Sequence, residues 1–279
     1  MLRLETTVKQ FVVFLLLLAV GFISSAHAAS DARFALVIGN SAYQHASSLK
    51  NPSNDSKDIA AALRKLNFKT IFLQNATKQQ IEQAVSKYIS RLDAEGGVGL
   101  FYFAGHGVQF QGNNYLLPVD VTIGTEREIQ ERSFSLAGLL NKTREMSDVT
   151  NIVVLDACRN NPFSQYDLNK GRSANPGGNK IKMPELDTGL SKLDAPPNTL
   201  IAFATAPGHI ARDGKGRNSP YTAKLIRSMM RSGLSINEVF RQVRQDVLQL
   251  TGGEQVPWET SSLIDDFYFK PRSSIPIGF

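Results

Sequence analysis

The sequence has a single cysteine, Cys158, among 279 residues, so no disulfide bond can form within one chain. No long apolar run follows residue 30, and we predict no transmembrane helix in that part of the chain. The net charge of +6 is spread along the chain without accompanying aromatic clusters, so we predict no nucleic-acid partner. A lone cysteine leaves three interpretations open: a small buried apolar side chain, a disulfide between chains, or a free reactive thiol.

The first thirty residues have the pattern of a secretory signal. Arg3 and Lys9 precede an apolar run over residues 11–23, and Ala26-His27-Ala28 has the small residues of a cleavage site. The run is shorter than the roughly 20 residues that a membrane span needs. We therefore predict a signal peptide over residues 1–28 and an exported chain, periplasmic or secreted, without membrane attachment. An uncleaved anchor is the alternative.

Short apolar runs alternate with segments of helical periodicity in the remaining chain. The pattern predicts strands over 33–39, 68–73, 99–103, 115–118, 151–156, 199–204 and 266–269, and helices over 54–66, 77–95, 133–144, 219–231 and 235–250. This alternation is typical of an α/β domain with a mostly parallel sheet of about six strands and helices on both faces. We assign residues 29–270 to one such domain and 271–279 to a tail. A glycine- and proline-rich stretch over about 164–197 interrupts the pattern and is interpreted as a linker.

Two residues with the chemistry of a nucleophile and a base follow predicted strands. His106 comes after strand 99–103, and Cys158 comes after strand 151–156. Ligands bind outside the carboxyl ends of strands in open parallel sheets, so the two residues are expected at one functional edge. A neighbouring imidazole can deprotonate a thiol and later protonate a leaving amine. Each residue alone is also typical of a turn or of core packing, and His45 and His209 are weaker candidates for the base.

Attack of a thiolate on a carbonyl group also needs hydrogen-bond donors for the developing oxyanion. Gly107 has no side chain, so its N–H can approach a substrate carbonyl closely, and the N–H of Cys158 is a second candidate donor.

Five segments together resemble the caspase, metacaspase and paracaspase superfamily, and most of all its bacterial caspase-like cysteine peptidases. They are RFALVIGNSAY, LKNPSNDSKDIAAAL, FYFAGHG, VVLDACRNNPF and LIAFATAPG, and the resemblance covers about residues 33–270. Ala157-Cys158-Arg159 fits the caspase signature, with a histidine about 50 residues upstream. Asp156 and Asn160 depart from that signature, which has Gln and Gly at these places and belongs to the animal caspases.

The resemblance implies a caspase-like sandwich fold and a cysteine endopeptidase. In it Cys158 would be the nucleophile, His106 the acid and base, and the N–H groups of Gly107 and Cys158 the oxyanion hole.

The same resemblance implies that Asp55 and Asp156 line the pocket for the residue before the cut, with Asp213 as a further candidate. Paired carboxylates favour Arg or Lys through charge-assisted hydrogen bonds, so peptide or protein substrates with basic residues are expected. The alternatives are a favourable charge at a helix N-terminus for Asp55 and a strand-end turn for Asp156.

The linker is a candidate for self-cleavage, with a solvated loop as the alternative. Its basic residues up to position 193 are Lys170, Arg172, Lys180, Lys182 and Lys192. We predict no cofactor and no metal site. The resemblance leaves a calcium dependence open, because some metacaspases need calcium, and Asp187 and Asp194 are candidate ligands here. No spaced Asp/Asn series typical of a calcium loop surrounds them.

Two other functions remain open from the sequence. One is a non-catalytic binding module with the same fold, and the other is a thiol-based redox sensor. The lack of a second, resolving cysteine counts against the sensor.

Overall fold

The computed structural model describes residues 31–272 except positions 124, 147, 159–189, 208, 210 and 212. The described residues belong to one compact unit. The predicted signal peptide, most of the predicted linker and most of the tail over 271–279 lie outside the described residues.

A sheet with the strand order β2-β1-β3-β6-β7-β8 forms the centre of this unit. Its strands are β1 (Arg33–Gly39), β2 (Lys69–Gln74), β3 (Gly97–Phe110), β6 (Val149–Cys158), β7 (Thr199–Phe203) and β8 (Trp258–Ser261). Neighbouring strands are parallel except β8, which pairs antiparallel with β7. The inner strands are buried on both faces, which explains their unbroken apolar sequences. The predicted mostly parallel sheet is confirmed.

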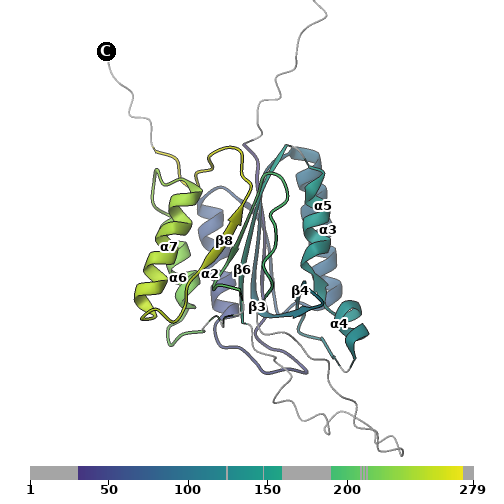
Figure 1. Ribbon diagram of the computed structural model, residues 1–279. Coiled ribbons are helices and arrows are strands. Elements are labelled where there is room, and N and C mark those ends of the chain that lie inside the picture. Colours follow the sequence, from purple (N-terminus) through teal and green to yellow (C-terminus); the bar gives the residue numbers. More distant parts are fainter. Residues whose placement is uncertain are drawn as a thin grey trace, which may run out of the picture. The chain divides into compact units, whose positions relative to one another are not determined.

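Helices cover both faces of this sheet (Figure 1). One face carries α2 (Pro52–Lys65), α6 (Pro220–Met229) and α7 (Ile236–Leu250), and the other carries α3 (Lys78–Glu95) and α5 (Leu136–Arg144). Alternate residues of β3 supply the two apolar cores: Tyr102 packs on the α2 side and Phe103 on the α3 side. No helix among the described residues has the length and apolar content that crossing a membrane requires.

The region after β3 differs from the sequence-based prediction. Strand β3 continues to Phe110, because β4 (Asn113–Leu116) pairs with it as an antiparallel hairpin beyond the central sheet. A helix and a short strand, α4 (Glu126–Arg132) and β5 (Phe134–Ser135), precede α5, and the prediction missed both.

The prediction of the last edge strand was wrong. The edge strand is β8, whereas residues 266–269 contribute a single isolated bridge, which joins Tyr268 to Ser235. Phe267 and Phe269 are buried against the α2 side of the core. The apolar alternation over residues 266–269 therefore arises because the two phenylalanines anchor this segment in the core, and not because the segment pairs with the sheet.

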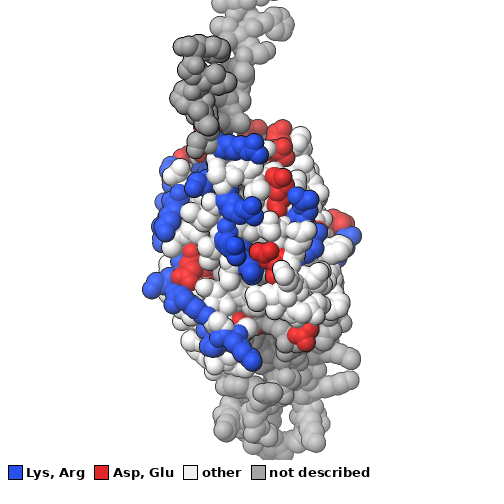
Figure 2. Space-filling view, turned by 90° about the vertical axis from the view of Figure 1, so that its left-hand side faces the viewer, with Lys and Arg blue, Asp and Glu red and all other residues white. Residues whose placement is uncertain are grey.

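Charged side chains of both signs cover the side of the molecule formed by α6 and α7, with Lys and Arg in the majority (Figure 2). Three of the basic groups in this part of the chain have acidic partners: Lys224 pairs with Asp246, Arg244 with Glu259, and Arg217 with Asp58.

Candidate active site

The predicted nucleophile and base lie on neighbouring strands. The parallel register of β3 and β6 pairs His106 with Cys158. Adjacent strands lie about 4.8 Å apart, so the two backbones are side by side at the carboxyl end of β6. His106 lies within β3 and Cys158 is the last residue of β6, which corrects the expectation that both follow their strands. The side chain of Cys158 lies outside the described part of the structure.

The His106 ring is buried and oriented by a backbone carbonyl. Its Nε2 lies 2.8 Å from the carbonyl oxygen of Ser47. A carbonyl can only accept, so Nε2 carries the proton and the neutral ring has its free lone pair on Nδ1. Nδ1 is buried and has no hydrogen-bond partner among the described residues. Burial lowers the pKa of His106, against the opposing effect of the Ser47 bond, and this favours the neutral ring.

Tyr43, in the loop after β1, holds the backbone of His106. Its hydroxyl accepts the N–H of His106 at 2.7 Å, and the two ring centroids are 4.5 Å apart. The same loop carries Ser47. Sequence reasoning assigned no role to either residue, because a loop has no periodic pattern that marks its contacts.

The N–H of Gly107 points away from β4 and toward the β6 side. The carbonyl of His106 accepts the N–H of Leu117 at 3.0 Å, so this carbonyl faces the β4 side of the strand. The C=O and N–H of one planar trans peptide group point in opposite directions, and the N–H that shares this group belongs to Gly107. That orientation is the one that an oxyanion donor beside Cys158 requires.

Two buried carboxylates converge on the start of α6. Asp55 in α2 is 2% exposed, and Asp156 in β6 is 7% exposed. The backbone N–H of Ser219 donates to Asp55 Oδ1 at 3.0 Å, while the Ser219 hydroxyl donates to Asp156 Oδ2. Thr222 donates to the same Oδ2 at 2.7 Å. One serine therefore links both predicted pocket carboxylates.

The carboxylate pair has an unfavourable environment for two negative charges. Burial, followed by repulsion from Asp156, raises the pKa of Asp55. Burial also raises the pKa of Asp156, although the hydroxyls of Ser219 and Thr222 oppose this shift. No lysine or arginine among the described residues forms an ion pair with either carboxylate. Such a pair is electrostatically suited to take up a cation.

Asp213 lies in the segment between β7 and α6 and contacts the chain that leads from the Ser47 loop into α2. Its Oδ2 accepts the N–H of Lys50 at 3.1 Å, and its carbonyl accepts the side-chain amide of Asn51. The negative charge of Asp213 also contributes to the raised pKa of Asp55 and of Asp156. Asp213 is thus near the pair and also tethers the loop that carries Ser47.

The remaining candidates lie elsewhere. His45 and His209, the weaker candidates for the base, are exposed. His106 is the histidine that pairs with Cys158 in the register of β3 and β6. Among the described residues, no group of three or more His, Cys, Asp or Glu side chains is placed to hold a metal ion. Of the two candidate calcium ligands, Asp194 is described and belongs to no such group, whereas Asp187 lies outside the described residues.

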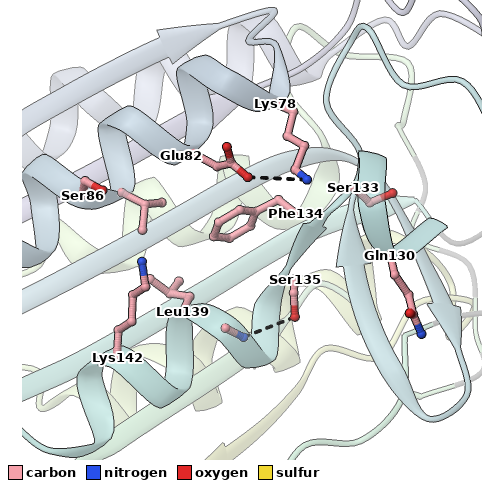
Figure 3. Close-up of a pocket in the computed structure, with 11 residues that line it drawn as sticks. Lys78, Glu82, Ser86, Gln130, Ser133, Phe134, Ser135, Leu139 and Lys142 are labelled. Atoms are coloured by element: carbon pink, nitrogen blue, oxygen red, sulfur yellow. Dashed lines mark hydrogen bonds and ion pairs between the residues drawn. The ribbon is translucent and has the colours of Figure 1, made fainter. Parts of the chain in front are cut away.

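A pocket of about 340 Å³ lies between α3 and α5, on the opposite face of the sheet from the carboxylate pair (Figure 3). Lys78 and Glu82 form an ion pair at its rim, and Phe134 and Leu139 lie along it. None of the predicted site residues lines this pocket.

Residues 32–268 match the family model described as the caspase domain. The chain belongs to the caspase-domain family. This caspase-domain chain is 28% identical over 235 residues to the human mucosa-associated lymphoid tissue lymphoma translocation protein 1 and, equally, to its mouse homolog. The match covers 83% of this chain and 26% of each relative, so the chain spans about a quarter of their length.

Solved structures show the same fold. The crystal structure of caspase-1 from Spodoptera frugiperda has a TM-score of 0.61 and 17% identity, and the match covers 88% of this chain and 93% of that one. The structure of pro-Sf-caspase-1 has the same score and identity and is covered over 94% of its length. The predicted caspase-like sandwich and the resemblance to this superfamily are confirmed.

Proposed function

We propose that this caspase-domain protein is a cysteine endopeptidase that cleaves after Arg or Lys, with Cys158 as nucleophile and His106 as acid and base. The observation that carries the proposal is the buried pair Asp55 and Asp156, which has no cationic partner among the described residues and lies beside the His106–Cys158 register position.

The chemistry follows from the state of the imidazole. The free Nδ1 of His106 accepts the thiol proton of Cys158, and the resulting thiolate attacks the substrate carbonyl carbon. The carbonyl oxygen takes the negative charge and is stabilised by the N–H groups of Gly107 and Cys158. The peptide C–N bond then breaks as the imidazolium protonates the leaving amine, and the acyl group stays on Cys158 as a thioester. His106 next accepts a proton from water, which attacks the thioester, and returns this proton to the sulfur as the acid product leaves.

The carboxylate pair accounts for the proposed specificity. A guanidinium or ammonium group between Asp55 and Asp156 would neutralise their repulsion and replace the proton that burial of the carboxyl groups favours. An acidic substrate side chain would add a third buried negative charge. The pocket therefore attracts Arg and Lys and rejects Asp.

Two further parts of the proposal concern the whole chain. We place the protein outside the cytoplasm, periplasmic or secreted, on the basis of the signal pattern over residues 1–28. Basic residues between 164 and 193 make the linker a substrate for its own active site. N-terminal sequencing of the protein recovered from cell fractions tests both, because each cut leaves a new N-terminus.

The decisive experiment uses residues 29–279 with fluorogenic peptides that differ only in the last residue before the cut: Arg, Lys or Asp. We expect cleavage after Arg and Lys, loss of all cleavage in Cys158→Ala, and loss of the basic preference in Asp156→Asn. Full activity of Cys158→Ala overturns the proposed nucleophile. Cleavage after Asp overturns the pocket, and absence of cleavage of all three peptides favours a non-catalytic binding module.

A further inference from the structure

We infer that Leu190, held in place by Ser191 and Asn114, is a positioning residue that supports Gly107 in the oxyanion hole. This inference rests on the proposed peptidase function, because it assigns a task to a residue beside the proposed oxyanion donor.

Gly107 lies just beyond the part of β3 that pairs with described residues of β6. Among the described residues, the register between β3 and β6 runs as far as His106 and Cys158, and Gly107 is the next residue of β3. Its N–H points away from β4, because the carbonyl of the same peptide group accepts a hydrogen bond from the N–H of Leu117. The position of the Gly107 N–H thus depends on packing as well as on the ladder.

Leu190 supplies that packing from the α3 side of the sheet. It is 1% exposed and belongs to the same apolar core as Ala157. A Cβ built on Gly107 would lie 3.1 Å from Leu190 Cδ2 and 3.3 Å from Ala157 Cβ. The glycine backbone is therefore packed closely against these two side chains, and Leu190 limits its movement toward the α3 side.

A two-way backbone clamp determines where Leu190 lies. Asn114 Oδ1 accepts the N–H of Ser191 at 2.7 Å, and Asn114 Nδ2 donates to the Ser191 carbonyl at 2.9 Å. The Ser191 hydroxyl donates to the carbonyl of Gly112 at 2.8 Å. Asn114 and Gly112 belong to the hairpin formed by β3 and β4, so the clamp ties Leu190 to the strand that carries Gly107.

Leu190 and Ser191 lie near the C-terminal end of the predicted linker. A cut after a basic residue between 164 and 189 would leave Leu190 and Ser191 joined to β7 and still bound to Asn114. The support for Gly107 is thus compatible with cleavage after Lys170, Arg172, Lys180 or Lys182, whereas a cut after Lys192 would separate Leu190 and Ser191 from β7.

A loss of this support should raise the free energy of the transition state more than that of the bound substrate, because the oxyanion forms only when the thiolate attacks. Removal of a whole oxyanion donor lowers kcat by about 10²–10³-fold. We expect Leu190→Ala, which only loosens the donor, to lower kcat by about tenfold while KM for an Arg peptide stays within about twofold.

The test compares Leu190→Ala with Leu190→Met, which restores side-chain volume, and with Leu92→Ala, an equally buried leucine of the same core that lies on α3. Steady-state kinetics and the inhibition constant of a peptide aldehyde ending in Arg are measured for each, together with Tm. An aldehyde forms a tetrahedral adduct that uses the oxyanion hole. We expect weaker aldehyde binding and lower kcat in Leu190→Ala, recovery in Leu190→Met, and wild-type kinetics in Leu92→Ala despite a similar fall in Tm.

A second pair of variants guards against a simple folding defect. The methyl group of Gly107→Ala would press on Leu190, so we expect the double variant Gly107→Ala/Leu190→Ala to have a higher kcat than Gly107→Ala alone. Unchanged kcat and aldehyde affinity in Leu190→Ala, or equal losses in Leu92→Ala, overturn the inference and leave the peptidase intact. A wild-type protein that cleaves no peptide overturns the proposed function, and the inference falls with it.

Discussion

Replacement of Asp55 by asparagine should stabilise the protein in the absence of substrate and weaken catalysis at the same time. Asparagine is nearly isosteric and keeps an Oδ1 acceptor for the N–H of Ser219, but it removes one of two buried charges. The pKa of Asp55 is raised from 3.8 to about 8, chiefly by burial and then by repulsion from Asp156. The folded protein therefore retains a proton that the unfolded chain releases between about pH 4 and pH 8. Wild-type stability declines as the pH rises through this window, and the Asp55→Asn variant lacks the part of that decline that comes from Asp55.

The size of the effect follows from the shift. One pKa unit corresponds to about 1.4 kcal/mol, so the shift of Asp55 sets a ceiling of roughly 6 kcal/mol. Relaxation of the pocket and entry of water reduce this cost, and we expect about 2 kcal/mol. For a domain of this size that corresponds to a rise in Tm of about 4–8 °C at pH 8 and to no difference at pH 4.

The assay is thermal unfolding of wild type and Asp55→Asn from pH 4 to pH 8.5, with cleavage of an Arg peptide measured in parallel. Asp58→Asn is the matched control, because Asp58 lies on the same helix but pairs with Arg217, which lowers its pKa. We expect no stabilisation in this control. For Asp55→Asn, loss of one charged partner of the substrate should lower kcat/KM by about 100-fold. A lower Tm than wild type at pH 8, or unchanged cleavage, would refute the reasoning.

Three other predictions follow from single contacts. Tyr43→Phe leaves the buried N–H of His106 without its acceptor, so we expect a loss of about 1–3 kcal/mol in chemical denaturation and a lower kcat; wild-type values for both would contradict the contact. Thr222→Val removes a donor to Asp156 and raises its pKa further, so the acid limb of kcat/KM for Arg peptides should move to higher pH, and an unmoved limb counts against the pocket. Gly39→Ala places a methyl group in collision with the Ser56 side chain, so α2 must shift. We expect the free energy of unfolding to fall by about 1–3 kcal/mol in the same denaturation assay, and an unchanged value would show that the helix adapts.

The strand and helix pattern was largely predictable because it is local. The apolar run over 33–39 and the helix that Thr77 caps depend on neighbouring residues, and both lie where the sequence placed them. The segment 266–269 was misassigned because a chain segment that anchors two phenylalanines in a core has the same alternation as an edge strand.

The sequence allowed the candidate catalytic residues to be chosen by their chemical type, but it did not show how their side chains are held in place. A lone cysteine and a histidine near strand ends, with acidic residues at Asp55 and Asp156, were visible in the sequence. The carbonyl of Ser47 that orients the imidazole was not, since any residue of that loop offers the same carbonyl.

The main alternation of strands and helices and the chemical types available near the strand ends were readable in the sequence alone, because periodicity and residue chemistry are properties of short segments. Only the tertiary structure decided that His106 and Cys158 share one register position, that Ser219 joins Asp55 to Asp156, and that Leu190 packs against Gly107. These contacts join residues far apart in the chain, and their geometry follows from how the whole sheet and its helices pack together.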